Sequence, residues 1–317
     1  MKEQYLVTGG AGFIGSHLVK RLLDEGKNVI VMDNFDNYYD PKIKHQNLAP
    51  FLDHPDFHLH TADLRNIEAI RELFSSHPIT GVFHLAARGG VRASLDNPFP
   101  HEEINIRGTL NLLKVCERYN LDFILFASSS TVYGEGARLP FSESGRVGCP
   151  ISYYAVTKQT GELLMQTYHS LYGTPVTCLR FFTVYGPRQR PDMAISKFVR
   201  SIDKGETISI FGKGYPLRDY VYISDVIDGI LLASKNASGF QVFNIGRGET
   251  VGLGRLVSLI ETALGKEARI EVLPAQAGDV SITYANIDKA KSLLDYEPEV
   301  KIEEGIQKFI RWYKERR

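Results

Sequence analysis

The sequence predicts an α/β protein built on a doubly wound parallel sheet, with a smaller α/β region toward its C-terminal end. In the first half of the chain, short β-branched runs alternate with longer segments of helical periodicity, as in successive βαβ units. These runs are apolar throughout, as expected of strands that helices cover on both faces. After about Gly186 the alternation stops, and Pro and Gly residues separate shorter elements.

The elements expected in the first half follow one another as strand and helix. Strands are predicted at residues 5–7, 29–32, 57–59, 81–85, 123–127 and 176–181, and helices at 16–25, 67–74, 104–119 and 155–172. Residues 240–245 are predicted to form a strand that returns to the main sheet. We therefore place one domain at residues 1–182, with a returning segment near 219–247, and a second region at 183–317.

Composition narrows the function classes. The chain has 317 residues, of which 43% are hydrophobic and 23% charged, as is usual for a globular protein. Lys+Arg and Asp+Glu number 37 each, so no nucleic-acid-binding or membrane-binding surface is predicted. No apolar stretch approaches the ~20 residues that span a bilayer. The three cysteines are far apart and match no metal-ligand spacing, which favours free thiols in a reducing cytoplasm and no bound metal.

The first strand leads into a glycine-rich turn within the run YLVTGGAGFIGSH at residues 5–17. Gly9, Gly12 and Gly15 let the backbone approach a pyrophosphate at the N-terminus of the next helix, as in Rossmann-type folds. Such spacing is a weak signal alone, and its place at the first strand–helix junction makes it informative. Asp33 ends the next strand, where a carboxylate binds both adenosine ribose hydroxyls and repels a 2′-phosphate. The pattern predicts NAD rather than NADP; the alternative is that Asp33 only ends a strand.

Two pairs of residues at the ends of later strands extend this site. Asp63 and Leu64, after the third strand, are placed to meet the adenine edge. Ala86 and Ala87, after the fourth, offer small side chains where a ligand must lie close to the backbone. For either pair, ordinary loop chemistry is the alternative.

Tyr154 and Lys158 are four residues apart, so they share one helix face. A free tyrosine has a pKa near ~10. The lysine cation, with the positive nicotinamide of NAD⁺, favours the phenolate, which can then act as a base. This spacing is common by chance, but here it follows the fifth strand of a dinucleotide-binding pattern. Ser129, at the end of that strand, is expected to hydrogen-bond the substrate hydroxyl that loses its proton; a polar loop that satisfies its own backbone is the alternative.

The chain resembles the extended short-chain dehydrogenase/reductase family, in its nucleotide-sugar branch, in four segments: TGGAGFIGSH, ASSSTVYG, YYAVTK and RFFTVYGPRQRP. Residues 33–41, 86–98 and 180–195 most resemble UDP-glucuronate 4-epimerases. The resemblance implies that Tyr154 accepts the C4 hydroxyl proton while hydride passes to NAD⁺, and that hydride then returns to the opposite face of the 4-keto sugar. The remaining cofactor contacts that we expect are Phe13, Ile14, Asn34, Asp36, Leu85, Asn105, Ser128 and Phe182.

The residues before Tyr133 bear on the choice of reaction. Similar 4,6-dehydratases carry an Asp-Glu pair there and UDP-glucuronate decarboxylases a Glu, whereas residues 129–131 are Ser, Ser and Thr. Without a carboxyl group, epimerisation is the simpler outcome. Thr183 stands where UDP-galactose 4-epimerases place Asn, and its small hydroxyl leaves room for a C6 carboxylate. UDP-glucuronate/UDP-galacturonate is therefore preferred over UDP-glucose/UDP-galactose or N-acetyl sugars, and UDP-glucuronate decarboxylation is a further alternative.

The rest of a nucleotide sugar needs cations and flat apolar surfaces. Arg218 matches the family's diphosphate-binding arginine, although an ion pair with Asp219 or Asp225 is the alternative. Phe211 is expected either against the uracil or in the core. Asp279 aligns with a residue that binds the uridine ribose, and Gln276 replaces an Arg of the galactose enzymes, which leaves Arg218 more of the charge to balance. Further expected sugar contacts are Gly89, Ser129, Ser130, Tyr154, Arg190 and Ala194.

The helices predicted at 104–119 and 155–172 carry more apolar surface than the covering of one sheet face requires. In relatives these two helices pair across a two-fold axis into a four-helix bundle. The resemblance therefore implies a homodimer.

Overall fold

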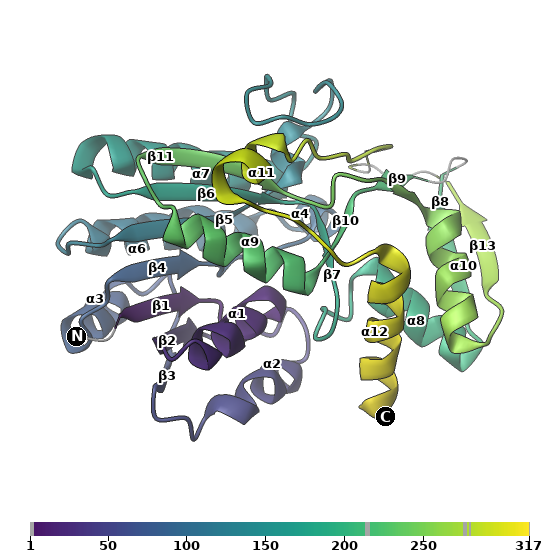
Figure 1. The fold of residues 1–317 in the computed structure, drawn as a ribbon, viewed down its shortest axis with the longest axis horizontal. Coiled ribbons are helices and arrows are strands. Elements are labelled where there is room, and N and C mark those ends of the chain that lie inside the picture. Colours follow the sequence, from purple (N-terminus) through teal and green to yellow (C-terminus); the bar gives the residue numbers. More distant parts are fainter. Residues whose placement is uncertain (1–2, 213–215, 275–277, 279, 317) are drawn as a thin grey trace.

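A seven-stranded sheet forms the centre of the computed structural model, which describes residues 3–212, 216–274, 278 and 280–316 (Figure 1). Its order is β11-β6-β5-β4-β1-β2-β3, and every neighbouring pair is parallel. The strands are β1 (Gln4–Thr8), β2 (Asn28–Asp33), β3 (Phe57–Thr61), β4 (Gly81–His84), β5 (Phe123–Ser129), β6 (Val176–Phe181) and β11 (Phe240–Ile245). The predicted doubly wound parallel sheet is confirmed, as is the return of residues 240–245 to it.

Helices cover both faces of the sheet because successive residues of each strand point to opposite sides. In β2, Val29 and Val31 belong to the apolar cluster that contains the inner faces of α1 (Phe13–Asp24) and α9 (Ile223–Lys235). Ile30 and Met32 belong to the cluster on the other face, with α3 (Ile67–Ser76), α6 (Thr109–Cys116) and α7 (Tyr153–Tyr172). All four side chains are at most 1% exposed. A strand in this position therefore needs an uninterrupted apolar run.

Helix α7 begins two residues before the predicted start at 155. The Ser152 side chain accepts a hydrogen bond from the Ala155 N–H at 3.1 Å and so caps the first turn. Gly173, with a φ of 74°, ends the helix in the left-handed conformation that glycine adopts at low cost. The cap places Tyr154 in the first turn of the helix, one of whose faces packs against the sheet.

The single helix predicted at 104–119 is wrong in its bounds and in its regularity. The helical segment begins with α5 (Phe99–Glu102), widens into the π-helical turn η2 (Glu103–Gly108), and ends with α6 at Cys116. The Thr109 hydroxyl donates to the Asn105 carbonyl at 2.6 Å, and the Asn105 amide is bonded outside the helix. Apolar periodicity does not register such a widened turn, which is often found at functional sites.

The predicted smaller α/β region follows β6 and is built from short pairs of strands. These are the parallel pairs β7 (Thr183–Tyr185) with β10 (Tyr220–Tyr222) and β8 (Thr207–Phe211) with β13 (Arg269–Leu273), and the antiparallel pair β9 (Leu217–Arg218) with β12 (Val251–Gly252). Its helices are α8 (Ala194–Lys204), α10 (Leu253–Leu264), α11 (Asp288–Leu294) and α12 (Ile302–Glu315). The remaining short elements are α2 (Pro41–Leu48), η1 (Ala49–Phe51), α4 (Val91–Asp96) and η3 (Ser130–Tyr133). One apolar cluster runs from α1 through α9 to α12, so the two regions share a core.

Candidate active site

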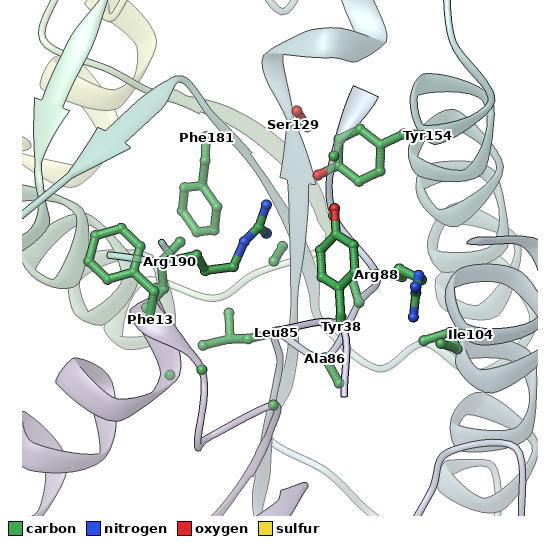
Figure 2. A pocket seen from close by; sticks show the side chains of 18 of the residues that line it. Phe13, Tyr38, Leu85, Ala86, Arg88, Ile104, Ser129, Tyr154, Phe181 and Arg190 are labelled. Atoms are coloured by element: carbon green, nitrogen blue, oxygen red, sulfur yellow. The ribbon is translucent and has the colours of Figure 1, made fainter. Parts of the chain in front are cut away.

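A cavity of about 500 Å³ opens at the carboxyl ends of β1, β2, β4 and β5 (Figure 2). This is the edge at which parallel α/β sheets bind ligands, because the strand order reverses there. The structure brings together on its wall most of the residues expected from the sequence: Gly9, Gly12, Phe13, Ile14, Gly15, Asp33, Asn34, Asp36, Asp63, Leu64, Leu85, Ala86, Ala87, Gly89, Ser128, Ser129, Ser130, Tyr154, Lys158, Phe182, Thr183 and Arg190.

Four expected site residues do not line this cavity. Asn105 is 3% exposed and bonds to the Arg88 backbone, and Ala194 is exposed at the start of α8. The ring of Phe211 lies 4.5 Å from the Arg92 guanidinium, and Arg218 donates to the carbonyls of Leu217 and Ser281. Asp279 and Gln276 lie outside the described residues. The roles given to these positions stay predictions.

The glycine turn after β1 has no room for side chains. A Cβ built on Gly15 would lie 2.2 Å from the Gly9 carbonyl oxygen, and one on Gly9, whose φ is 71°, would lie 2.7 Å from the Ala86 backbone. Helix α1 starts after Gly12 with no side-chain cap, so its first N–H groups face the cavity unshielded. Such a turn fits a bound diphosphate, whose negative charge is favoured at a helix N-terminus.

The carboxylate of Asp33 is held by the turn beside it. It accepts hydrogen bonds from the backbone N–H groups of Ala11 at 3.0 Å and Phe35 at 2.9 Å. Burial raises the pKa of Asp33, while the charge of Lys44 and these two N–H donors oppose the rise. Each oxygen keeps further acceptor capacity toward the cavity, so the residue fits the binding of ribose hydroxyls.

Tyr154 and Lys158 both reach the cavity from α7. The sequence predicts that the lysine cation stabilises the phenolate, but the ammonium makes its hydrogen bond elsewhere. The Lys158 ammonium donates to the Ala127 carbonyl at 2.7 Å, and its nitrogen lies 6.0 Å from the centroid of the Tyr154 ring. Burial lowers the pKa of Lys158 to about 8. Burial also raises the pKa of Tyr154, and the hydrogen bond with Ser129 and the charge of Arg190 oppose that rise. In the protein alone, the phenol is thus tuned by Ser129 and Arg190 more directly than by the lysine.

The hydroxyl groups at the end of β5 are ordered by one another. The Ser129 oxygen accepts from the Thr131 N–H at 3.2 Å and from the Thr131 hydroxyl at 3.0 Å. Ser128 donates instead to Glu162, which forms a buried ion pair with Arg180 at 2.7 Å. Both serines line the cavity, but the Ser129 hydroxyl bonds within the hydroxyl cluster and the Ser128 hydroxyl bonds to the ion pair.

A second buried network lies at the ends of β1 and β4. His84 lies 2.8 Å from the Thr8 hydroxyl through Nδ1 and 2.9 Å from the Thr109 hydroxyl through Nε2. The Asn105 amide donates to the Arg88 carbonyl at 3.0 Å and to the Thr157 hydroxyl at 2.9 Å. Burial lowers the pKa of His84 to about 3, so the imidazole stays neutral. These bonds join the ends of β1 and β4 to η2 and α7.

The carboxylates on the cavity wall lie at the carboxyl ends of β2 and β3. Among the described lining residues they are Asp33, Asp36 and Asp63, and none stands beside Tyr154. Asp63 is paired with Arg65, whose guanidinium lowers the pKa of that carboxyl to about 2. The wall around the phenol carries hydroxyl groups instead, so the described site has no side-chain carboxyl group to remove a proton from C5 or to protonate a leaving hydroxyl.

Several cavity residues were not predicted from the sequence. They are Met32, Tyr38, Tyr39, Lys44, Ala62, Arg88, Gly90, Val91, Ile104, Ala127, Thr131, Phe181, Val184 and Met193. Tyr38 and Arg88 lie in the loops that follow β2 and β4, which end at the ligand-binding edge, and that position in the chain was the one available signal. None of the helices in the described ranges is long and apolar enough to cross a membrane.

Comparison with known proteins agrees with this geometry. The NAD dependent epimerase/dehydratase family matches residues 5–246. The UDP-glucuronate 4-epimerase of Thermodesulfobacterium geofontis is 42% identical over 98% of this chain and 96% of its own. Among solved structures, the UDP-glucuronic acid 4-epimerase from Bacillus cereus in complex with UDP-glucuronic acid and NAD has a TM-score of 0.93 at 36% identity, covering 99% and 100% of the two chains. A UDP-glucose 4-epimerase from Thermotoga maritima with UDP-glucose has a TM-score of 0.91 at 34% identity, covering 99% of each chain.

Proposed function

Because this chain belongs to the NAD dependent epimerase/dehydratase family, we propose that it interconverts UDP-glucuronate and UDP-galacturonate by epimerisation at C4. The enzyme class is an NAD-dependent UDP-sugar 4-epimerase, as in the relatives that match over its full length. The observation that carries the proposal is the wall around Tyr154, which hydroxyl groups line and which has no carboxyl group among its described residues.

The cofactor side of the cavity fits NAD, which when bound accepts a hydride from the sugar and gives it back. We assign the diphosphate to the turn formed by Gly9, Gly12 and Gly15, because a Cβ at Gly9 or Gly15 would close the space. We assign the adenosine ribose to Asp33, whose carboxylate is oriented by two backbone N–H groups.

Tyr154 is our candidate for the base that removes and returns the C4 hydroxyl proton. Its hydrogen bond with Ser129 and the charge of Arg190 stabilise the phenolate against burial. Lys158 holds a positive charge beneath the site and ties α7 to β5 through the Ala127 carbonyl. Epimerisation needs one group that removes the C4 hydroxyl proton and returns it, which a single phenol can do.

We assign the uronate carboxylate to Thr183 and to the hydroxyl groups of Ser129, Ser130 and Thr131. All four line the same cavity as Tyr154. Hydroxyl donors stabilise a carboxylate without proton transfer. By fixing its orientation they also oppose loss of CO₂ from the 4-keto acid, since that step needs the C–C bond aligned with the ketone. Substantial UDP-pentose among the products would contradict this assignment.

Product analysis tests the proposal. The purified protein is incubated with UDP-glucuronate, UDP-glucose or UDP-N-acetylglucosamine without added NAD, and products are identified by NMR. We expect UDP-galacturonate from the first and little conversion of the others. Tyr154→Phe is expected to abolish turnover and to keep NAD bound. Near-normal turnover by that variant would show that the base is another group, and conversion of UDP-glucose alone would replace the uronate by a neutral sugar.

The remaining substrate contacts and the domain boundaries are also proposals. We keep Arg218, Phe211 and Asp279 for the nucleotide, beyond the sugar, with Gly89, Arg190 and Ala194 nearer the sugar. Residues 1–182 and a segment near 219–247 would bind mainly NAD, and 183–317 mainly the nucleotide sugar. The three cysteines are unpaired, which agrees with the reducing cytoplasm that we propose as the compartment.

We propose that the protein forms a homodimer through α5, α6 and α7. These helices carry exposed apolar side chains: Phe99, Leu110, Tyr153, Val156 and Leu163, between 40% and 73% exposed. A self-complementary apolar face of this kind suits a two-fold interface. Leu163→Arg is expected to yield monomers by light scattering at micromolar concentration, with Leu293→Arg, an exposed leucine on α11, as the matched control. Monomeric wild-type protein would contradict the proposal.

A further inference from the structure

The side chain of Tyr38 crosses the cofactor side of the cavity. Tyr38 belongs to the loop after β2, and Figure 2 shows its hydroxyl pointing toward that of Tyr154. It also reaches the loop after β4, because a Cβ built on Gly90 would lie 2.5 Å from the Tyr38 hydroxyl oxygen. Strand β1 lies between β2 and β4 in the sheet. The tyrosine therefore spans from one flank of the glycine turn to the other.

Two guanidinium groups hold the Tyr38 ring in this position. The central carbon of Arg88 lies 4.4 Å from the ring centroid and that of Arg190 lies 5.4 Å from it. Both distances are within the range of cation–π attraction. Arg190 is itself fixed by the two carboxylate oxygens of Asp192, at 3.0 and 2.8 Å.

The backbone of Tyr38 is linked to Arg88 through the side chain of Asp36. Its N–H donates to Asp36 Oδ1 at 2.8 Å, and the Arg88 guanidinium donates to that oxygen at 3.2 Å. Lys44 on α2 binds the Asp36 carbonyl at 2.8 Å. The loop is thus tied to the loop after β4 on one side and to α2 on the other. Burial raises the pKa of the Tyr38 phenol, so its side chain stays neutral between the two cations.

A dinucleotide that extends from Asp33 to Tyr154 must pass over the glycine turn, which is the strip that Tyr38 spans. We propose that Tyr38, held between Arg88 and Arg190, is a cofactor-retaining residue that closes over bound NAD and slows its release. The inference rests on the proposed function only in that NAD stays with the protein from one turnover to the next. The two arginines also place positive charge beside the path of the dinucleotide.

The rate of NAD release tests this inference without any nucleotide sugar. Protein loaded with NAD is diluted into excess alcohol dehydrogenase and ethanol, which convert released NAD to NADH that absorbs at 340 nm. Tyr38→Leu removes the ring and is expected to release NAD about 10-fold faster, as for the loss of about 1.4 kcal/mol of binding. Tyr38→Phe keeps the ring between the arginines and is expected to stay within about 3-fold of wild type.

Matched variants distinguish the loss of NAD retention by Tyr38 from a general loss of structure. Tyr172→Leu removes a tyrosine whose hydroxyl binds Glu117 at the far end of α7, and it is expected to release NAD at the wild-type rate. Arg88→Met removes one face of the stack and is expected to accelerate release as well; it carries the test if Tyr38→Leu does not fold. Release from Tyr38→Leu, or in its place Arg88→Met, at the wild-type rate overturns the inference. Absence of epimerase turnover by the wild type would instead count against the proposed function, and the release rates would still decide the role of Tyr38.

Discussion

Replacing Lys158 by methionine tests a buried charge that the fold accommodates at a cost in stability. The residue is 3% exposed, and burial lowers its pKa from 10.5 to about 8. That change corresponds to about 3.4 kcal/mol by which folding disfavours the ammonium at neutral pH. Methionine would lose the hydrogen bond to the Ala127 carbonyl, worth about 1 kcal/mol. We therefore expect Lys158→Met to raise the free energy of unfolding by about 2 kcal/mol, while turnover falls at least ~100-fold.

The unfolding free energy gained by Lys158→Met should decrease as the pH rises. Because the folded-state pKa of about 8 lies below the unfolded value of 10.5, the unfolded wild-type chain binds more protons between these pH values. Wild-type stability from this group therefore rises with pH across that window. The advantage of the variant is complete below pH 8 and disappears toward pH 10.5.

Thermal unfolding of both proteins, freed of NAD and followed by circular dichroism from pH 7 to pH 10, measures this difference. For a chain of 317 residues, 2 kcal/mol corresponds to a Tm about 3 °C higher. A variant that unfolds at or below the wild-type Tm at pH 7 would refute the reasoning, and so would a gap that stays constant up to pH 10.

Three further substitutions address the cofactor turn, the sugar wall and the support beneath them. Gly15→Ala places a Cβ 2.2 Å from the Gly9 carbonyl oxygen, so NAD affinity by fluorescence titration should fall at least ~10-fold; unchanged affinity would contradict the diphosphate assignment. Thr183→Asn should lower the ratio of kcat/KM for UDP-glucuronate over UDP-galactose by about 10-fold, and an unchanged ratio would remove Thr183 from the specificity argument. Glu162→Leu leaves Arg180 buried without its carboxylate, at a cost of about 3 to 5 kcal/mol or a Tm about 4 to 7 °C lower by calorimetry; an unaltered Tm would mean that the pair is not stabilising.

The central sheet could be predicted from the sequence because a strand buried on both faces must be apolar at every position. The strand predicted at 176–181 has the observed bounds of β6, and the strand at 240–245 those of β11. The glycine turn could also be predicted from the sequence, because two backbone segments approach so closely at Gly15 that only glycine fits there. In both cases a local physical requirement leaves a local sequence pattern.

The missed features depend on partners that are distant in the chain. Tyr38 is placed by Arg88 and Arg190, and Phe35 before it adopts a positive φ of 51° that no residue preference announces. The π-helical turn depends on Asn105, which is held by Arg88 and Thr157 from outside the helix. Long-range side-chain contacts of this kind have no spacing in the sequence, so periodicity could not reveal them.

The hydrogen-bonded chain through Thr8, His84 and Thr109 has a consequence for how such enzymes diverge. It fixes the relative positions of β1, β4 and the helix that follows, through groups that are at most 1% exposed. Thr183 and Ser130, which we assign to the sugar, are not among its bonded atoms. Substitutions at the sugar wall can therefore change the substrate while β1, β4 and the following helix keep their relative positions. A protein engineer could use the same separation to retarget the sugar pocket without rebuilding the cofactor groove.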